Sequence, residues 1–226
     1  NRLMTSFARL LGPLNGGLAI TVTLIGLLLA ATTGIIGASV VLLALLGLPV
    51  MLKEGYDEHL ATGTVCAVGT LGILIPPSIM LVLMADRMAM SVGDLFLGAV
   101  FPGALLGTLY ISYIFLYGLI RPNHAPATRG EPIDLKAVWD LFKAIVPAAF
   151  LILAVLGSIF FGLAPPTEAA GVGAMGAMLI ALQRRSLDLD RLREITRGTL
   201  RISSMVFMIL IGASIFSLVF RGYGGD

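Results

Sequence analysis

The sequence predicts an all-α integral membrane protein, a helical bundle that contains a re-entrant hairpin and a broken helix. Three observations lead to this fold class. The chain is 58% hydrophobic and only 12% charged, with a mean hydropathy of +0.98. Several apolar runs approach the roughly 20 residues that a helix needs to cross a bilayer. One of these runs is interrupted halfway by glycines and a proline pair, which disturb a regular helix.

The first apolar stretch, residues 18–50, has two interpretations. It is one long tilted helix, or two arms of roughly 14 residues that fold back near 32–39, each about 21 Å long and too short to cross a core of about 30 Å. Basic residues concentrate on the cytoplasmic side of membrane proteins. A hairpin leaves only Arg87 and Arg221 on the other side, whereas a single crossing also moves Arg2 and Arg9 there. The charge distribution therefore favours the hairpin. A short polar turn, 53–59, follows and is expected to be solvated.

The broken segment spans residues 60–85. Gly69 and Gly72 loosen the helix, and Pro76 and Pro77 then remove two backbone donors. Inside a membrane the freed carbonyls and amides need partners from protein, lined water or an ion. Broken helices at bilayer depth are typical of transporter binding sites. The alternative is a proline kink that serves packing alone.

The rest of the chain falls into three parts. A helix over 92–120 begins after Ser91 and completes the first part, residues 1–120. Residues 121–143 break the apolar pattern and predict an amphipathic arm along the membrane interface, with Trp139 on its apolar side. Residues 144–226 begin a second part with three helices, at about 144–163, 166–183 and 203–220, and a basic segment between the last two.

Glu168 is an acidic residue at the start of the 166–183 helix, after Pro166 and Thr167. An intramembrane carboxylate suggests proton transfer. In the first turn after a proline, a carboxylate also neutralises the positive end of the helix. The second role is favoured, so these three residues are treated as a structural motif.

The sequence excludes several function classes. It has no HExxH zinc motif, no intramembrane aspartate pair, no serine partnered with an intramembrane histidine, and no phosphate-binding loop for ATP. We therefore expect no enzymatic activity and no cofactor. A net charge of +2 gives no indication of nucleic-acid binding.

The apolar core does contain neutral oxygen atoms. Hydroxyls lie at the hairpin tip, on Thr32, Thr33 and Ser39, and flank the helix break, on Thr64, Thr70 and Ser78. Hard cations take oxygen ligands, and a neutral cage suits Na⁺. Alternatively, these hydroxyls bond back to their own helices.

The tip and the break each interrupt an apolar segment about halfway along, so we expect them to meet near the bilayer midplane and to bind one Na⁺. Residues Thr33, Gly34, Gly69 and Thr70 are the predicted ligands. The wider set of predicted ion- or substrate-binding residues is Thr32, Thr33, Gly34, Ser39, Gly69, Thr70, Gly72, Pro76, Pro77 and Ser78.

Four motifs resemble one family, the large membrane subunit (DctM-like) of TRAP (tripartite ATP-independent periplasmic) transporters. They occur in the family's order and cover most of the chain. The motifs are Met51-Leu52-Lys53-Glu54-Gly55-Tyr56-Asp57, the glycine- and proline-rich Gly69–Ser78, Ser91-Val92-Gly93-Asp94-Leu95-Phe96, and Pro166-Thr167-Glu168-Ala169-Ala170.

The resemblance implies an elevator-type fold with inverted repeats, in a multi-pass protein of the bacterial inner membrane. It implies Na⁺-coupled import of organic acid anions, a small TRAP membrane subunit as partner, and delivery by a periplasmic substrate-binding protein. At the tip, Thr33-Gly34 stands where the family usually has Ser-Gly, and Ser39 where Asp is common. The chain is expected to be a fragment whose second hairpin is missing. The alternative function is a non-transporting membrane scaffold or assembly subunit.

Overall fold

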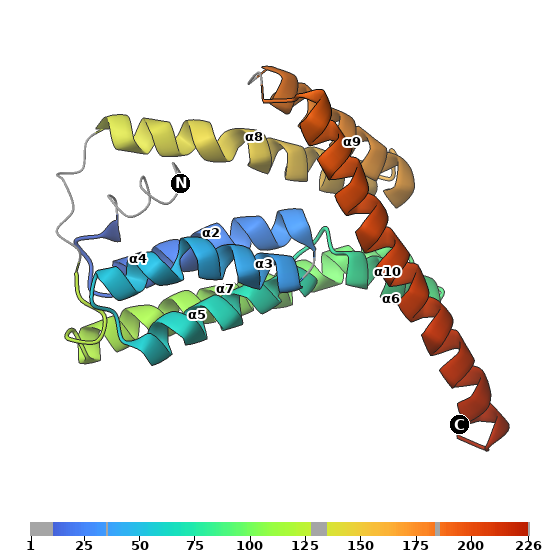
Figure 1. Cartoon of the computed structure of the whole chain (residues 1–226), viewed down its shortest axis with the longest axis horizontal. Helices are drawn as coiled ribbons and strands as arrows, with labels where there is room; N and C mark the ends of the chain where they lie inside the picture. The colour runs from blue at the N-terminus through green and yellow to red at the C-terminus, as the bar shows by residue number, and fades with distance from the viewer. Residues whose placement is uncertain (1–10, 35, 128–134, 184–185, 226) are drawn as a thin grey trace. The chain divides into compact units, whose positions relative to one another are not determined.

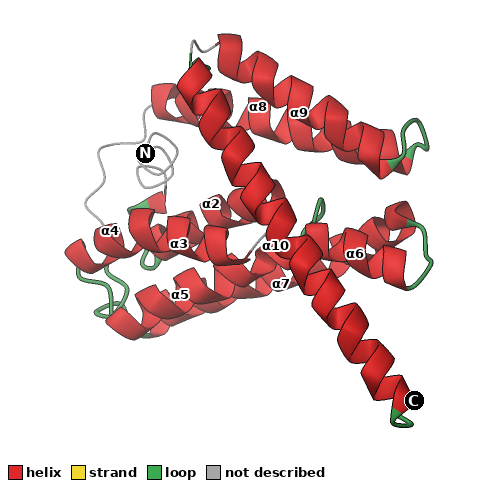
Figure 2. Cartoon of the chain, turned by 45° about the vertical axis from the view of Figure 1, so that its right-hand side comes forward, coloured by secondary structure: helices red, strands yellow, loops and turns green. Residues whose placement is uncertain are grey.

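The computed structural model describes residues 11–225 apart from 35, 128–134 and 184–185 (Figure 1). Every regular element in this described part is helical, which confirms the predicted all-α fold class (Figure 2). The chain forms two compact units, residues 1–174 and 175–226. The elements are α2 (Gly17–Thr33), α3 (Ile36–Leu46), α4 (Leu48–Lys53), α5 (Glu58–Thr70), the 3₁₀ helix η1 (Leu71–Ile73), α6 (Ile79–Arg87), α7 (Val92–Ile120), α8 (Leu135–Phe160), α9 (Pro166–Gln183) and α10 (Leu189–Gly222).

The stretch 18–50 folds as a helical hairpin. Gly47 packs against Val22, and Gly26 packs against Leu43, so α2 and α3 run antiparallel. The chain reverses at Gly34, whose φ of +60° is a backbone conformation that glycine adopts without strain. The two arms are therefore separate helices. Their depth in a bilayer stays a prediction.

The segment 60–85 is broken by the residues that the sequence indicated. Helix α5 tightens into η1, and the Leu71 carbonyl accepts the amide hydrogens of Leu74 and Ile75, both at 3.0 Å. The two prolines follow, joined by a cis peptide bond, and α6 begins at Ile79. The interruption is therefore confined to residues 71–78, between α5 and α6.

The core lies where α2, α3, α5 and α7 pack side by side in the first unit (Figure 1). Its fully buried side chains include Leu18 and Val22 from α2, Leu43 from α3, and Val68 from α5. These contacts fix the hairpin along the length of α5. The core therefore holds the hairpin tip near the helix break.

Two described helices, α7 and α10, are long and apolar enough to cross a membrane by length and composition. The side chain of Ser91 accepts the amide hydrogen of Asp94 at the start of α7, as the sequence indicated. Shorter apolar helical stretches cover 17–29, 39–53 and 149–160.

The interfacial arm and the helix expected after it form one continuous helix, so the expected boundary between 143 and 144 falls inside α8. No glycine lies near this point, and the helix continues through Pro147, one turn later, although proline lacks a backbone donor. The change from polar to apolar composition does not by itself interrupt backbone hydrogen bonding. Trp139 stacks on Phe142 with ring centroids 6.3 Å apart, and Lys143 Nζ lies 5.3 Å from the Trp139 ring centroid. Residues 121–127 are a loop, and the remainder of the expected arm, 128–134, lies outside the described residues.

The basic segment after residue 185 likewise continues into the last apolar helix. Helix α10 begins at Leu189, whose amide donates to the Asp188 carboxylate at 2.7 Å, and it runs unbroken to Gly222. Within the second unit, the described residues thus show no break between the basic and the apolar parts.

Candidate functional site

The hairpin tip touches the helix break. A Cβ built on Gly34 would lie 3.3 Å from the Ile79 amide nitrogen and 3.7 Å from the Pro77 carbonyl oxygen. Gly34 therefore abuts the backbone at the start of α6. Its positive φ is, in addition, a backbone conformation that residues with a Cβ rarely adopt. The two stretches that carry the predicted binding residues lie together in space.

A second contact joins the hairpin to the end of α5. Gly69 faces Val40 of α3, and a Cβ on Gly69 would lie 3.0 Å from the Val40 Cα. Ser39, one residue earlier on the same arm, is completely buried. Helix α3, the second arm of the hairpin, is thus held against the last turn of α5.

Ser78 carries a buried hydroxyl for which the described residues supply no hydrogen-bond partner. The residue is 2% exposed and extended (φ −129°, ψ 131°), and it directly precedes α6. A serine in this position usually accepts an amide hydrogen from the first turn of the helix, but the Ser78 side chain makes no such cap. Because an unpaired buried hydroxyl costs about 1–3 kcal/mol, this oxygen is suited to a ligand.

The other predicted residues of the break occupy mixed environments. Thr70 is the last residue of α5 and is exposed, and its Oγ1 donates to the Ala67 carbonyl at 2.7 Å. Gly72 and Pro76 are buried, and Pro77 is partly buried. The Thr70 hydroxyl thus bonds back to its own helix, but its oxygen keeps lone pairs that a cation could use.

Three further hydroxyl-bearing residues belong to the sequence prediction: Thr64, Thr32 and Thr33. Thr64 Oγ1 is buried and donates to the Leu60 carbonyl at 2.7 Å, which matches the back-bonding alternative. Thr32 and Thr33 are the last two residues of α2, and their side chains lie outside the described part of the structure.

The break sets two helix ends of opposite polarity close together along the chain. The carboxyl end of α5 carries partial negative charge, and the amino end of α6 carries partial positive charge. A cation is favoured at the first and a carboxylate at the second. Among the described residues no three His, Cys, Asp or Glu side chains cluster to hold a metal ion. The break itself, residues 69–79, contains no charged side chain.

The base of the hairpin is tied to two other segments, which the sequence did not indicate. The Leu18 amide donates to Tyr56 Oη at 3.1 Å, and the Gly16 amide donates to the Ala125 carbonyl at 3.0 Å. The Asp57 amide donates to the His124 carbonyl at 2.9 Å. The base of the hairpin is therefore held by backbone and hydroxyl hydrogen bonds to the 56–57 turn and to the 124–125 loop.

Asp57 belongs to the polar turn that the sequence predicted to be solvated, and it has structural partners. Its carboxylate accepts the amide hydrogens of His59 and Leu60 at 3.0 and 3.1 Å, which caps α5. Asp57 Oδ2 also lies 3.3 Å from His124 Nδ1. The hydrogen bond from the Leu60 amide, aided by those from His59 and His124, lowers the pKa of Asp57. The group is a carboxylate at neutral pH.

Glu168 lies in the first turn of α9, two residues after Pro166 opens the helix. It is exposed. This position suits a charge that neutralises the helix N-terminus. It stands apart in sequence from both the tip and the break.

A family model described as "Tripartite ATP-independent periplasmic transporter, DctM component" matches residues 1–225. The C4-dicarboxylate TRAP transporter large permease protein DctM of Pseudomonas aeruginosa is 33% identical over 215 residues, which cover 92% of this chain and 48% of that protein. The ectoine TRAP transporter large permease protein TeaC of Halomonas elongata is 28% identical over 225 residues, 97% of this chain and 51% of that protein.

The isethionate TRAP transporter permease protein DctMQ of Oleidesulfovibrio alaskensis is 30% identical over 222 residues, 95% of this chain and 34% of that protein. The chain thus spans about half the length, or less, of these relatives. Their names cover three different substrates.

Proposed function

The chain belongs to the family of the DctM component of tripartite ATP-independent periplasmic transporters, the large membrane permeases, and from this membership we propose that it forms the first ion-binding half of a Na⁺-coupled permease. The full-length protein would lie in the bacterial inner membrane as a multi-pass protein. It would import an organic acid anion together with Na⁺.

We propose two protein partners. A periplasmic substrate-binding protein would deliver the anion, and a small TRAP membrane subunit would accompany the permease. The relatives are named for C4-dicarboxylates, ectoine and isethionate, so members of this family serve more than one substrate. The proposal therefore commits to the class of organic acid anions and to no single compound.

The observation that carries the proposal is the unpaired hydroxyl of Ser78 beside the contact between Gly34 and the start of α6. One Na⁺ would bind between the tip and the break, with oxygen atoms from Thr33, Gly34, Gly69 and Thr70. The carboxylate of the cargo would lie closer to the amino end of α6, where the helix dipole favours negative charge. Placing both on one interrupted helix would couple their binding.

The test uses the full-length permease with its small subunit, reconstituted into vesicles. Uptake of a labelled organic acid is measured with an inward Na⁺ gradient, with a K⁺ gradient of the same size, and with or without the binding protein. We expect uptake only when Na⁺ and the binding protein are both present. Equal uptake in K⁺ would overturn Na⁺ coupling. A folded complex without uptake under any condition would support the scaffold alternative.

A further inference from the structure

One face of α10 carries a stripe of exposed side chains that changes from basic to apolar along the helix. Its members are spaced alternately four and three residues apart, which places them on the same face. In chain order they are Arg197, Arg201, Ser204, Met208, Ile211 and Ile215, and all six are exposed. Because α10 runs through them without a break, one continuous surface, here called the α10 stripe, joins two guanidinium groups to an apolar track.

The two arginines of the α10 stripe are available to a ligand. In the described part of the structure neither makes a hydrogen bond or an ion pair. Glu194, the nearest acidic residue in the sequence, lies one turn before Arg197, on the side away from the apolar part of the helix. Residues four apart on a helix are neighbours, and guanidinium groups donate to phosphate oxygens in a fixed fork. Arg197 and Arg201 are therefore placed to hold one phosphate between them.

Ser204 adds a hydroxyl at the start of the apolar part. Other hydroxyls of α10 donate to their own helix: Thr199 Oγ1 donates to the Ile195 carbonyl at 2.9 Å, and Ser214 Oγ donates to the Leu210 carbonyl at 2.8 Å. The Ser204 hydroxyl makes no such bond with the described residues. It is therefore free to donate to an oxygen atom of a ligand that Arg201, one turn earlier, also contacts.

The apolar part of the α10 stripe matches the depth of one leaflet. From Ser204 to Ile215 the helix advances about 16 Å at about 1.5 Å per residue, roughly half of a hydrocarbon core of about 30 Å. Met208 is 72% exposed and Ile211 is 57% exposed. The basic-residue distribution predicts that the Arg201 end faces the cytoplasm. The α10 stripe therefore has the length and polarity of a phospholipid in the cytoplasmic leaflet.

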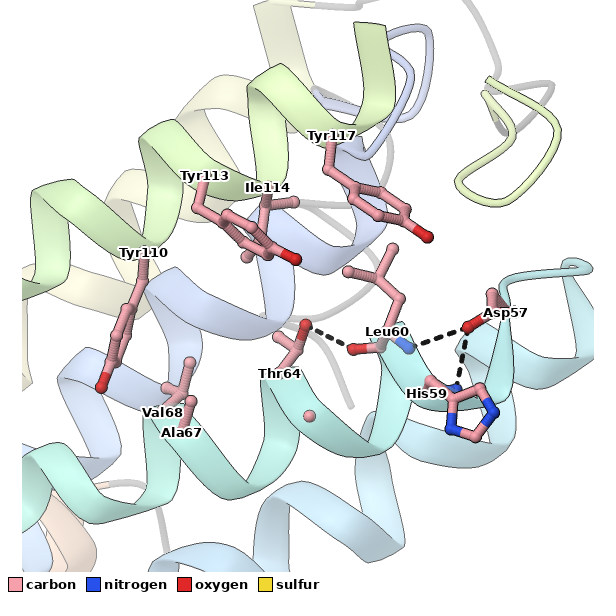
Figure 3. Close-up of a pocket in the computed structure, with 11 residues that line it drawn as sticks. Asp57, His59, Leu60, Thr64, Ala67, Val68, Tyr110, Tyr113, Ile114 and Tyr117 are labelled. Atoms are coloured by element: carbon pink, nitrogen blue, oxygen red, sulfur yellow. Dashed lines mark hydrogen bonds between the residues drawn. The ribbon is translucent and has the colours of Figure 1, made fainter. Parts of the chain in front are cut away.

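The largest groove described in the first unit does not share this polarity. It lies between α5 and α7 with a volume of about 390 Å³, and Tyr113 and Tyr117 line its α7 side (Figure 3). The Asp57 carboxylate also lines this groove, whereas no lysine or arginine does so among the described residues. A carboxylate repels an anionic head group. The basic end of α10 is therefore the surface that suits one.

We propose that the α10 stripe binds one acidic phospholipid of the cytoplasmic leaflet. The lipid phosphate contacts Arg197 and Arg201 and accepts the hydroxyl hydrogen of Ser204, and an acyl chain lies along Met208 and Ile211. A zwitterionic head group adds an ammonium group, which the two arginines repel. The site is separate from the proposed Na⁺ site and does not depend on it.

The experiment uses the full-length permease purified in mild detergent. Native mass spectrometry counts the phospholipids retained per chain, and thermal melts measure the shift on adding phosphatidylglycerol, phosphatidylcholine or inorganic phosphate. We expect one retained phospholipid and a raised melting temperature with phosphatidylglycerol alone. The variant Arg197→Gln/Arg201→Gln should weaken the affinity for phosphatidylglycerol about 25-fold, or about fivefold for each basic residue near an anionic head group.

The matched control is Arg191→Gln/Arg193→Gln. It removes the same charge from the same helix, but these arginines lie outside the α10 stripe and further from its apolar part. Solvent and salt screen charges at that distance, so the affinity should change less than about twofold. Ser204→Ala changes no charge and provides a second test, with an affinity about fivefold weaker for one lost hydrogen bond.

Four outcomes would overturn the proposal. The same thermal shift with inorganic phosphate would indicate a free-anion site, and the same shift with phosphatidylcholine would show that head-group charge is not recognised. Unchanged affinity in both Arg197→Gln/Arg201→Gln and Ser204→Ala would place the lipid elsewhere. A wild type that retains no phospholipid would also overturn it. A lower melting temperature for the arginine variant in that case would show that another part of the full-length protein covers the α10 stripe.

Discussion

Gly69 of α5 lies so close to Val40 of α3 that a Cβ on Gly69 would come within 3.0 Å of the Val40 Cα, and closer still to its Cγ2. The Val40 Cα is a backbone atom, which cannot rotate away as the Cγ2 methyl group can. This contact holds the last turn of α5 against the hairpin. It thereby fixes the position of the helix break relative to the tip.

Gly69→Ala should destabilise the protein. Forcing an extra methyl group into a packed contact costs about 1–3 kcal/mol, which corresponds to a fall of about 3–10 °C in the melting temperature. The control is Gly37→Ala on α3, where a Cβ meets no atom within 4 Å. Thermal melts of the full-length protein compare the two variants. Equal melting temperatures would show that the α3–α5 contact is looser than the structure indicates.

Ser78→Ala separates ligand binding from structural support. The Ser78 hydroxyl is buried and unpaired among the described residues, so its removal should leave the melting temperature unchanged or slightly higher without Na⁺. If the oxygen contacts the ion or the cargo, the variant should need about tenfold more Na⁺ or substrate for half-maximal uptake. Thr108→Val is the control, because the Thr108 hydroxyl donates to Ala104 on α7. A Ser78→Ala variant with wild-type uptake would remove Ser78 from the site.

The lowered pKa of Asp57 predicts that the stability of the protein depends on pH. Its folded pKa is lowered, first by the Leu60 amide, so its contribution is fully present above the unfolded value of about 3.9. The contribution is lost as the pH falls below that value toward the folded pKa. The melting temperature should therefore drop between about pH 5 and pH 3 in the wild type.

In Asp57→Asn this acid-side drop should shrink, because the side chain no longer titrates, while asparagine still caps α5. In His124→Gln most of the drop should persist, because the two amide hydrogen bonds to Asp57 remain. Melts at pH 3, 4, 5 and 7 in detergent provide the measurement. An unchanged acid-side drop in Asp57→Asn would assign it to other carboxylates.

The topology prediction concerns the two ends of the hairpin. A re-entrant hairpin returns to its starting side, so cysteines placed at Asn15 and Glu54 should both react with an impermeant thiol reagent from the cytoplasmic side. The native Cys66 is exposed, although the apolar context suggests burial, and it should be replaced by serine first. Labelling of the two positions from opposite sides of the membrane would contradict the re-entrant hairpin.

Local chemistry explains which parts of the fold the sequence could predict. Gly34 and the pair Pro76-Pro77 interrupt helices through their own backbone properties, so both interruptions were predictable. The continuity of α8 was not, because a change from polar to apolar side chains leaves backbone hydrogen bonding intact. Composition alone therefore gave a boundary that the helix does not have.

Long-range contacts explain the rest of what was missed. The Tyr56 hydroxyl accepts the Leu18 amide across 38 residues, and no local pattern links the two. The tyrosine face of α7 is visible as a spacing, but its partner surface on α5 becomes apparent only once the helices are packed. The sequence indicated Ser78 as a site residue because of its hydroxyl. It did not indicate that Ser78 precedes α6 without accepting an amide hydrogen from the first turn of that helix.

The last prediction concerns Thr33 and Thr70, the proposed Na⁺ ligands. Valine keeps the shape of threonine and removes one oxygen, so each of Thr33→Val and Thr70→Val should raise the Na⁺ concentration for half-maximal uptake about tenfold, as expected for a lost bond to a charged group. Thr70 is exposed, and its hydroxyl donates to the Ala67 carbonyl of its own helix, so its replacement should leave the melting temperature nearly unchanged. Gly72→Leu should abolish uptake, because Gly72 is buried in the break and a leucine would crowd it. Uptake titrated with Na⁺ in vesicles measures all three variants. If both threonine variants keep the wild-type Na⁺ dependence, their hydroxyls are not ligands, and the ion must be held by backbone carbonyls or bind at another place.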